Sequence, residues 1–502
     1  MLTTLIRREL LDNLMTFRFA AAVFIMLLLV VANTVVLIKD YEKRLVDYNT
    51  ALKTHRQQLR EDITYSSGEL KVDRPPNPLS IFNVGFDKRL GNEVTVSHRY
   101  VPTLWDAGKH GSTNSFMGMF AAIDVVFIFE AILSLLALIF AYDALAGEYE
   151  RGTLRLVLTH AVRRGYILLA KYMSAMLCLL VPLLMSLLLA VILLTTATSI
   201  SLNTDDFLRI GGIVLTSVVY LSVFYLIGML ISVATRRTGT ALMLSMFAWG
   251  FLVLVYPNVI LAVVPRSEAP KARAASAYNQ IEQMWEEFDR ERKQFLKNDA
   301  FPGENTDFNL MGSGGYSSGS FHRSSSILRY FYIKPVFMKR LKEDAESRVP
   351  HAQNYYGFLG PRVTDTAEKT WLIRKPALEE ILVQPTNVEG VWLKLSPVGL
   401  YDAATQAWAG TDLKGIRDFF EAAREYRQQM VDHFYNTKVF ESQQWFTGDK
   451  GTPDWDSLPQ FAFQRVDVDT NAKRALTDVC LLLMINIALF IIIFLIFVKS
   501  EV

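Results

Sequence analysis

Six long runs of apolar residues, separated by ordinary polar sequence, dominate the pattern of this 502-residue chain. A helix of roughly 20 apolar residues is long enough to cross about 30 Å of hydrocarbon. The runs occupy residues 17–38, 118–142, 168–196, 210–234, 240–264 and 475–498. The pattern therefore predicts a predominantly α-helical membrane protein with six transmembrane helices.

Basic residues near the ends of these runs predict the orientation of the chain, because loops rich in lysine and arginine remain in the cytoplasm. The loops of one side carry Arg7, Arg8, Arg18, Arg151, Arg155, Arg163, Arg164, Lys171, Arg236, Arg237 and Lys499. The short loop 199–206 on the other side is acidic instead. We therefore expect both termini to be cytoplasmic. The two long outer segments contain no cysteine, which suits a location in the bacterial inner (plasma) membrane.

A cleavable signal peptide is the alternative interpretation of the first run. Its apolar stretch exceeds the about 7–15 residues that are typical of a signal sequence. No good small-x-small cleavage site precedes Lys39. The sequence therefore favours a first span that stays in the mature protein.

Two polar segments, residues 39–117 and 265–474, are expected outside the cytoplasm. The first opens with an apolar residue at every seventh position, which predicts that the first span continues as a helix. These residues are Ile38, Leu45, Leu52 and Leu59. After prolines within residues 74–78, apolar residues alternate on both sides of a Gly-Asn turn and predict a small β-hairpin. The residues of this pattern are Leu79, Ile81, Gly91, Asn92, Val94 and Val96.

The second outer segment is expected to be mostly helical. Stripes of apolar and aromatic residues at helical spacing predict helices over residues 269–297 and 413–440. Such stripes indicate core packing more often than a ligand site. Residues 312–326 between them are rich in Gly and Ser, and we predict a mobile loop there.

Composition and motifs favour a chain without catalytic chemistry of its own. The net charge of +2 gives no bulk attraction to nucleic acid. Cys178 and Cys480 both lie in apolar runs and the seven histidines are scattered, so neither a disulfide nor a metal site is expected. The chain has no G-x-x-x-x-G-K-[ST] phosphate loop and no H-E-x-x-H motif. We expect no enzyme activity and no cofactor in this chain, and we interpret Glu379 and Glu380 as part of a solvated helix face.

Residues 143–171 are the most informative polar stretch between the spans and read DALAGEYERGTLRLVLTHAVRRGYILLAK. Two acidic residues come first, basic residues follow, and a Gly-Thr pair can start a short amphipathic helix. The positions are Glu148, Glu150, Arg151, Gly152, Thr153, Leu154 and Arg155. Residues 1–16 are amphipathic as well, and we expect this helix to lie flat in the inner interface. Taken alone, either stretch also fits a charged segment anchored at the membrane surface.

The order of these elements resembles the permease subunit of ABC-2 type ABC transporters, which has the type V, ABCG-like exporter fold. The resemblance covers the membrane part of the chain and rests on a GE-x-E-x-GT-L phrase and the basic residues after it. These positions are Gly147, Glu148, Glu150, Gly152, Thr153, Leu154, Arg163, Arg164 and Lys171. Residues 74–80, 395–397 and 409–411 are similar to phrases of the subgroup with large extracytoplasmic insertions.

In that family the loop equivalent to residues 143–167 forms a coupling helix that docks on a separate ATPase subunit, which binds ATP and magnesium. The resemblance implies that two permease chains, identical or paralogous, couple ATP hydrolysis to export or extraction of a substrate across the bacterial inner membrane. The ATPase-coupling residues that it implies are Gly147, Glu148, Glu150, Arg151, Gly152, Thr153, Leu154 and Arg155.

Two other functions are open as alternatives. In a mechanotransmission complex of the same family, ATPase strokes would move the outer helices and drive periplasmic partners without transport. The large helical outer segments motivate this alternative. A membrane-embedded enzyme is the second alternative, and the empty motif search argues against it.

Four polar residues within the spans are candidates for a translocation path. They are Asp124 and Glu130 in the second span, and Asp478 and Asn486 in the sixth. A charge in hydrocarbon is costly and often marks a pathway or an internal pair. For Glu130, a protonated and hydrogen-bonded structural role is an equal alternative.

Overall fold

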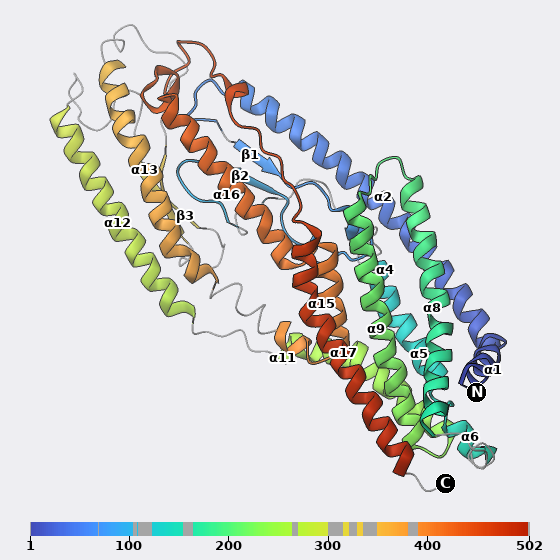
Figure 1. The fold of residues 1–502 in the computed structure, drawn as a ribbon. Coiled ribbons are helices and arrows are strands. Elements are labelled where there is room, and N and C mark those ends of the chain that lie inside the picture. The colour runs from blue at the N-terminus through green and yellow to red at the C-terminus, as the bar shows by residue number, and fades with distance from the viewer. Residues whose placement is uncertain are drawn as a thin grey trace.

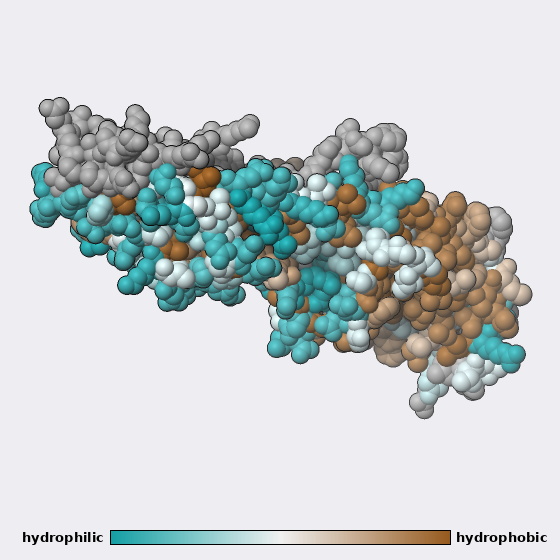
Figure 2. Space-filling model, turned by 90° about the horizontal axis from the view of Figure 1, so that it is seen from above, coloured by the Kyte–Doolittle hydropathy of each residue, from teal (hydrophilic) through white to brown (hydrophobic). Residues whose placement is uncertain are grey.

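The computed structural model describes residues 2–68, 70–103, 108, 123–153, 164–263, 270–299, 315–320, 329–334, 349–379 and 390–499. The molecule is elongated, with a helical bundle at one end and a second helical region at the other (Figure 1). Hydrophobic residues cover the surface of the bundle, whereas the second region is largely hydrophilic (Figure 2). Six described helices are long and apolar enough to cross a membrane. This confirms the prediction of a predominantly helical membrane protein with six spans.

The spans consist of α2 (Phe17–Glu61), α4–η3–α5 (Val125–Ile128, Phe129–Leu133, Ser134–Ala141), α8 (Arg164–Thr196), α9 (Thr204–Ala234), α10–η4–α11 (Thr238–Trp249, Gly250–Val255, Tyr256–Val263) and α17 (Val468–Lys499). Both chain ends lie at one end of the bundle, together with α1 (Leu2–Leu14) and α6 (Ala146–Glu150) (Figure 1). We call this end the terminal side. The hydrophilic part extends from the opposite end, the distal side, and we call it the distal region.

Helix α2 joins the two parts of the molecule. It is continuous over 45 residues and therefore about 68 Å long. Thr16 caps its start, because the Thr16 side chain accepts a hydrogen bond from the Phe19 N–H at 3.3 Å. The helix runs from the terminal side through the bundle and on into the distal region (Figure 1). The predicted continuation of the first span as a helix is confirmed.

Helix α9 is the central helix of the bundle, since α5, α15 and α17 all pack against it. Helix α15 (Pro397–Ala409) comes from the second polar segment, yet it contacts both α9 and α17. Tyr401 of α15 stacks on Tyr220, near the middle of α9, with ring centroids 4.2 Å apart. The Tyr401 hydroxyl group also lies 2.8 Å from Ser217 Oγ. The chain therefore returns from the distal region to the span bundle, which the hydropathy pattern did not predict.

Helices α5 and α9 approach each other closely at Gly228. A Cβ atom at this position would lie 2.6 Å from Ala141 Cβ and 3.0 Å from Leu138 Cδ2. Small residues permit such approaches between membrane helices. The close approach thus gives a physical reason for glycine at this position.

Three long helices form most of the distal region, namely α12 (Pro270–Asn298), α13 (Val349–Leu378) and α16 (Leu413–Asn436). The helices expected over residues 269–297 and 413–440 are present as α12 and α16, and α13 was not predicted. Aromatic side chains fill the core, where Trp285, Tyr355, Phe419 and Phe446 are at most 1% exposed. Short 3-10 helices complete it, at η8 (Val439–Glu441), η9 (Gln443–Trp445) and η10 (Trp455–Ser457).

A small antiparallel sheet lies beside this core and pairs β1 (Leu70–Asp73) with β2 (Glu93–Val96). The predicted sheet is present and its second strand lies where expected, but the first strand was wrongly placed at residues 79–81. Those residues belong to the 3-10 helix η1 (Pro78–Ile81). The Asn77 side chain accepts a hydrogen bond from the Leu79 N–H, and Pro78 suits the first helical position, so this stretch turns instead of extending.

A second antiparallel sheet pairs β3 (Gly315–Ser320) with β4 (Arg329–Lys334). Strand β3 lies inside the Gly/Ser-rich stretch that was predicted to be a loop, so that prediction is wrong for residues 315–320. The β4 sequence RYFYIK is rich in residues that favour strands. Pairing with such a partner orders a sequence whose own preference for a strand is weak.

We predict that Gly228→Ala lowers the stability of the protein by about 1–3 kcal/mol, because the added methyl group overpacks the contact between α5 and α9. Gly211→Ala on the same helix is the matched control, since a Cβ atom there meets nothing within 4 Å. Thermal unfolding of both variants in the same detergent measures the difference. Equal unfolding midpoints would show that α5 can move away from α9 without cost.

Candidate functional site

On the terminal side, the chain leaves the second span through the short helix α6. Gly152 follows this helix with a φ angle of 70°, and its N–H donates to the Tyr149 carbonyl oxygen at 3.1 Å. Glycine favours this left-handed conformation because it has no Cβ atom. Thr153 is helical again, and Leu154 and Arg155 lie outside the described residues.

A buried lysine links this loop to the bundle. Lys171 of α8 is 6% exposed. Its ammonium nitrogen lies 2.7 Å from Glu148 Oε1 and 3.1 Å from Glu9 Oε1. Because Glu148 belongs to α6 and Glu9 to α1, one cation holds three elements together. The sequence contained all three residues but no signal that they meet.

Two further contacts fix the position of α6. The Glu150 carboxylate accepts hydrogen bonds from the Thr238 N–H at 2.9 Å and from the Thr238 hydroxyl at 2.6 Å, so it binds the start of α10. Ser232 of α9 accepts hydrogen bonds from the N–H groups of Leu145 and Ala146 at 3.0 and 2.9 Å. The turn before α6 is therefore held by α9, and its end by α10.

These contacts separate the predicted coupling residues into two groups. Gly147 is buried, and the carboxylates of Glu148 and Glu150 bind groups of this same chain. Arg151 and Thr153 are exposed at the tip of the loop, together with the intervening Gly152. The first group positions the loop, whereas the second is exposed to solvent.

Asp124 has a structural position at the distal end of the second span. Its carboxylate caps α4 by accepting a hydrogen bond from the Phe127 N–H at 2.7 Å. It also accepts one from the Val84 N–H at 2.9 Å. Asp124 therefore ties the loop after η1 to the start of the span.

Asp478 and Asn486 of α17 have partners as well. Asp478 pairs with Lys394 at 2.8 Å, which connects α17 to the segment before α15. The Asn486 side chain donates to the Val219 carbonyl oxygen of α9 at 3.1 Å. Hydrogen bonds of this kind join membrane helices.

Glu130 differs from these three polar residues. It lies in the π-helical turn η3 and is 8% exposed. Its backbone carbonyl accepts a hydrogen bond from the Tyr220 hydroxyl at 3.1 Å, but no described residue donates one to its carboxyl group. Turns of π-helix often mark functional sites in helices. Glu130 is therefore the strongest of the four candidates for a role in translocation.

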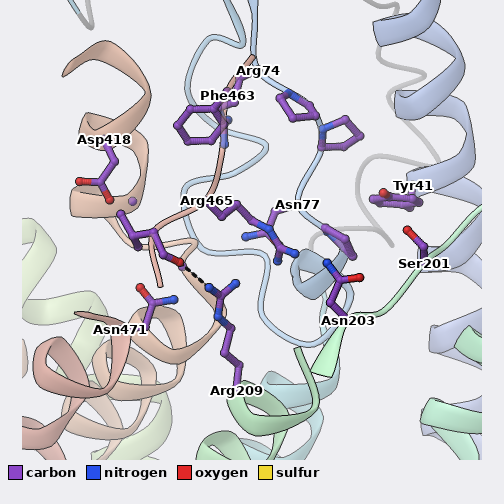
Figure 3. Close-up of a pocket in the computed structure, with 16 residues that line it drawn as sticks. Tyr41, Arg74, Asn77, Ser201, Asn203, Arg209, Asp418, Phe463, Arg465 and Asn471 are labelled. Carbon is purple, nitrogen blue, oxygen red and sulfur yellow. Dashed lines mark hydrogen bonds between the residues drawn. The ribbon is translucent and has the colours of Figure 1, made fainter. Parts of the chain in front are cut away.

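On the distal side, a cavity of about 250 Å³ lies where the spans meet the distal region (Figure 3). The sequence phrases at residues 74–80 and 409–411 meet beside it, because the Asn77 side chain donates to the Ala409 carbonyl oxygen at 2.8 Å. The third phrase contains Ser396, which caps the start of α15, and Gly410 ends the same helix with a φ angle of 68°. The three phrases thus place α15 against the loop that contains residues 74–78, which line the cavity.

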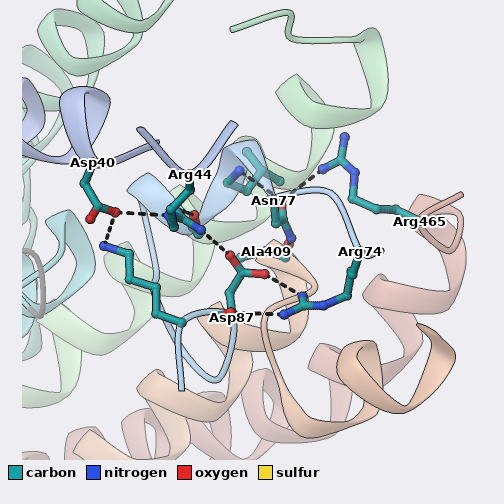
Figure 4. Close-up of polar contacts among 10 residues, drawn as sticks. Asp40, Arg44, Arg74, Asn77, Asp87, Ala409 and Arg465 are labelled. Atoms are coloured by element: carbon teal, nitrogen blue, oxygen red, sulfur yellow. Dashed lines mark hydrogen bonds and ion pairs between the residues drawn. The ribbon is translucent and has the colours of Figure 1, made fainter. Parts of the chain in front are cut away.

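An ion-pair network braces this junction (Figure 4). Asp87 is 5% exposed and binds two guanidinium groups, with Oδ1 2.6 Å from Arg74 Nη1 and Oδ2 2.8 Å from Arg44 Nη1. Arg44 also pairs with Asp40 at 3.1 Å, and Asp40 with Lys88 at 2.7 Å. The network connects α2 to the loop on either side of η1.

Among the described residues, one group has the spacing of possible metal ligands. The ligand atoms of His55, Asp73 and Glu93 lie within 4.8 Å of one another. Sequence reasoning treated the histidines as scattered, because these residues come from α2, β1 and β2. His55 Nδ1 already lies 2.9 Å from Asp73, and Lys71 lies 3.2 Å from Glu93. We therefore interpret the group as an ion-paired cluster that joins α2 to the sheet.

The chain belongs to the ABC-2 transporter family, since the family model described as ABC-2 family transporter protein matches residues 3–297. Its family and its six long apolar helices make it a multi-pass membrane protein. A second family model, a domain of unknown function (DUF3526), matches residues 380–464, which include α15 and α16.

Two curated relatives are each named "Probable ABC transporter permease protein NosY". The relative from Stutzerimonas stutzeri is 33% identical over 140 residues, and the one from Pseudomonas aeruginosa is 33% identical over 141 residues. Each match covers 27% of this chain and 50% of the relative. The chain thus spans about half the length of the curated relatives it matches.

The charge network leads to a prediction about pH. Burial alone would raise the pKa of Asp87, but the Arg74 and Arg44 guanidinium groups outweigh burial and hold this pKa below its ordinary value. A lowered pKa stabilises the fold above the unfolded-state pKa of about 3.9, and this contribution disappears as pH falls through the folded-state pKa. We predict that Asp87→Asn costs about 3–5 kcal/mol at neutral pH, because it leaves two guanidinium groups without their carboxylate.

Denaturant unfolding at pH 7 and at progressively lower pH measures this effect, and the difference from the wild type should shrink once the pH is below about 4. Asp456→Asn is the control, because the Asp456 side chain is 74% exposed in its pair with Arg60. If Asp87→Asn lowers the free energy of unfolding by no more than the control does, a central role for the network is contradicted.

Proposed function

We propose that this permease subunit couples ATP hydrolysis on its ATPase partner to export or extraction of a substrate across the bacterial inner membrane. In this proposal the terminal side, with both chain ends, faces the cytoplasm, and the distal region faces the periplasm. The basic residues of the terminal side and the acidic loop before α9 support this orientation. Two such chains, identical or paralogous, would enclose the path of the substrate.

The Lys171 contacts carry the proposal. They connect the loop that contains the family phrase with α1 and with the span α8. Because Lys171 is buried and paired, separating it from either carboxylate is costly. A force applied to α6 would therefore move α1 and α8 together, as a coupling element requires.

Within the loop, we assign ATPase contact to the exposed tip at Arg151, Gly152 and Thr153. Leu154 and Arg155 stay in the proposed set as the next residues of the same sequence phrase and lie outside the described residues. Gly147 is buried, Glu148 pairs with Lys171 and Glu150 accepts hydrogen bonds from Thr238, so these three residues would instead hold the loop in position. This assignment refines the expectation that all of these residues contact the ATPase.

Inside the membrane, we propose Glu130 for the translocation path. Its carboxyl group is buried at a π-helical turn, beside α9, and lacks the structural partners that Asp124, Asp478 and Asn486 have. A π-helical turn can shift to ordinary α-helix with little disruption and so can move its side chain. Such a movement would expose Glu130 alternately during transport.

One observation favours mechanotransmission as the second candidate function. Helix α2 continues without a break from the first span to Glu61, deep in the distal region. Its far end contacts the distal core, because Arg60 pairs with Asp456 at 2.9 Å and the Trp455 indole N–H donates to the Asp62 carbonyl oxygen at 3.2 Å. A tilt of the first span would therefore displace the distal region, where a periplasmic partner could bind.

We predict that Glu148→Gln and Lys171→Met each reduce ATP turnover by the reconstituted permease–ATPase complex by at least half. Glu148→Gln removes one partner of the buried Lys171 ammonium group, whereas Lys171→Met leaves the half-buried Glu9 and Glu148 without their cation. Both changes loosen α6. The double variant should lose less than the sum of the single losses, because the two residues act through one contact. Turnover in lipid, normalised to the amount of assembled complex, is the measurement.

Asp12→Asn is the control for this experiment, because Asp12 is an exposed carboxylate on the same helix as Glu9. Strictly additive losses would contradict the coupling role of the Lys171 contacts. Full turnover in both single variants would contradict it as well.

Two further variants separate transport from mechanotransmission. If the complex transports, Glu130→Gln should lower ATP turnover severalfold, and normal turnover would remove Glu130 from the path. If it transmits movement, the spectrum of a spin label at Gln58 should change when ATP is added to the Asn49→Ala variant. The spectrum should not change in Asn49→Pro, because proline interrupts α2. The label requires a background without Cys178 and Cys480. No shift in Asn49→Ala would contradict mechanotransmission.

A further inference from the structure

The cavity on the distal side is lined by elements from both parts of the molecule (Figure 3). Pro75, Pro76 and Pro78 form one wall, which is stiff because proline fixes φ and offers no N–H. Ser201 and Asn203, from the loop between α8 and α9, form another and are exposed. The cavity is therefore accessible at the distal edge of the span bundle.

Two arginines extend their guanidinium groups toward one another in this cavity (Figure 3). Arg209 comes from α9 and is 3% exposed, whereas Arg465 comes from the segment before α17. They share one buried carboxylate, with Asp206 Oδ1 2.9 Å from Arg465 Nη2 and 3.6 Å from Arg209 Nη1. Two cations with one carboxylate leave a net positive charge beside the cavity.

Other acidic residues near the cavity do not supply the missing negative charge. Asp418 lines the cavity but pairs with Arg474 at 2.8 Å. Asp205 and Asp467 are exposed, so solvent and salt screen their charges. The site therefore attracts an anion from solution or from the membrane surface.

Three buried polar atoms of the residues that line the cavity lack hydrogen-bond partners among the described residues. They are the donors Arg74 Nε and Arg209 Nε and the acceptor Asn471 Oδ1. Asn471 is 1% exposed, and the other side of the Arg209 guanidinium group is fixed by its hydrogen bond to the Val466 carbonyl oxygen. Buried polar atoms are normally paired, so this arrangement calls for a ligand that both accepts and donates hydrogen bonds.

We propose that this cavity binds a phosphate group. Its oxygens would accept hydrogen bonds from Arg209 and Arg465, because guanidinium groups match phosphate in charge and geometry. A protonated phosphate oxygen or an adjacent hydroxyl group would donate to Asn471, which a carboxylate cannot do. The group belongs either to a lipid headgroup of the distal leaflet or to a soluble phosphate. As a statement about the substrate class, this inference rests on the proposed export function; as a binding site, it does not.

Equilibrium dialysis of the full-length chain with ³²P-labelled inorganic phosphate tests the proposal. The protein is kept in a non-ionic detergent, at constant ionic strength maintained with sodium chloride. We expect saturable binding that equimolar acetate does not displace. Arg465→Gln should weaken binding by about tenfold or more, because it removes a charged donor. Unchanged binding in this variant overturns the site.

Competition by short-chain phosphatidylglycerol, used below its micelle concentration, distinguishes the two sources of phosphate. Displacement at lower concentrations than unlabelled inorganic phosphate assigns the site to lipid headgroups. Displacement only at higher concentrations assigns it to a soluble phosphate. Absence of saturable binding for both ligands overturns the proposal.

Two variants guard against misfolding and non-specific effects. Arg209→Lys keeps the buried positive charge but loses the planar donor fork, so it should fold and bind phosphate more weakly. Arg60→Gln, which removes an exposed ion pair, should bind phosphate like the wild type. Because dialysis requires no ATPase, loss of phosphate binding would leave the coupling proposal intact. A failed coupling experiment would likewise leave this site intact.

Discussion

The ammonium group of Lys171 lies in a part of the bundle that is almost closed to water, and the terminal side is arranged to keep that charge paired. A buried cation without a counter-charge would destabilise the fold by about 3–5 kcal/mol. Glu9 and Glu148 meet this requirement from two different elements. The constraint therefore holds the N-terminal helix, the loop after the second span and α8 in one relative position.

On the distal side buried charges are paired as well, with arginines in place of lysine. Asp87 and Asp206 each bind two guanidinium groups, so the junction between the spans and the distal region depends on buried ion pairs as well as on apolar packing. The two ends of the bundle are connected through α9, which carries Ser232 beside α6 and Arg209 beside the cavity. Helix α9 therefore contacts both the loop after the second span and the cavity on the distal side.

The contacts of the GE-x-E-x-GT-L phrase give part of it a structural role within this chain. The carboxylates of Glu148 and Glu150 bind groups of this chain and hold the loop, and the chain adopts a left-handed conformation at Gly152 within the exposed tip. A short motif can thus be recognised because it shapes a loop, even where only part of it touches a partner. Of the four polar candidates in the spans, the same distinction leaves Glu130 as the one whose side chain receives no hydrogen bond or ion pair from a described residue.

The sequence by itself determined the six spans, the amphipathic N-terminal helix and two of the long distal helices. These features depend on hydropathy and spacing within about 20 neighbouring residues, which a local pattern contains. The tertiary structure decided the partners of Lys171, the return of α15 to the bundle and the first strand of the small sheet. An ion pair or a strand pair forms only when residues distant in the chain come within a few ångströms, and no local pattern records that approach.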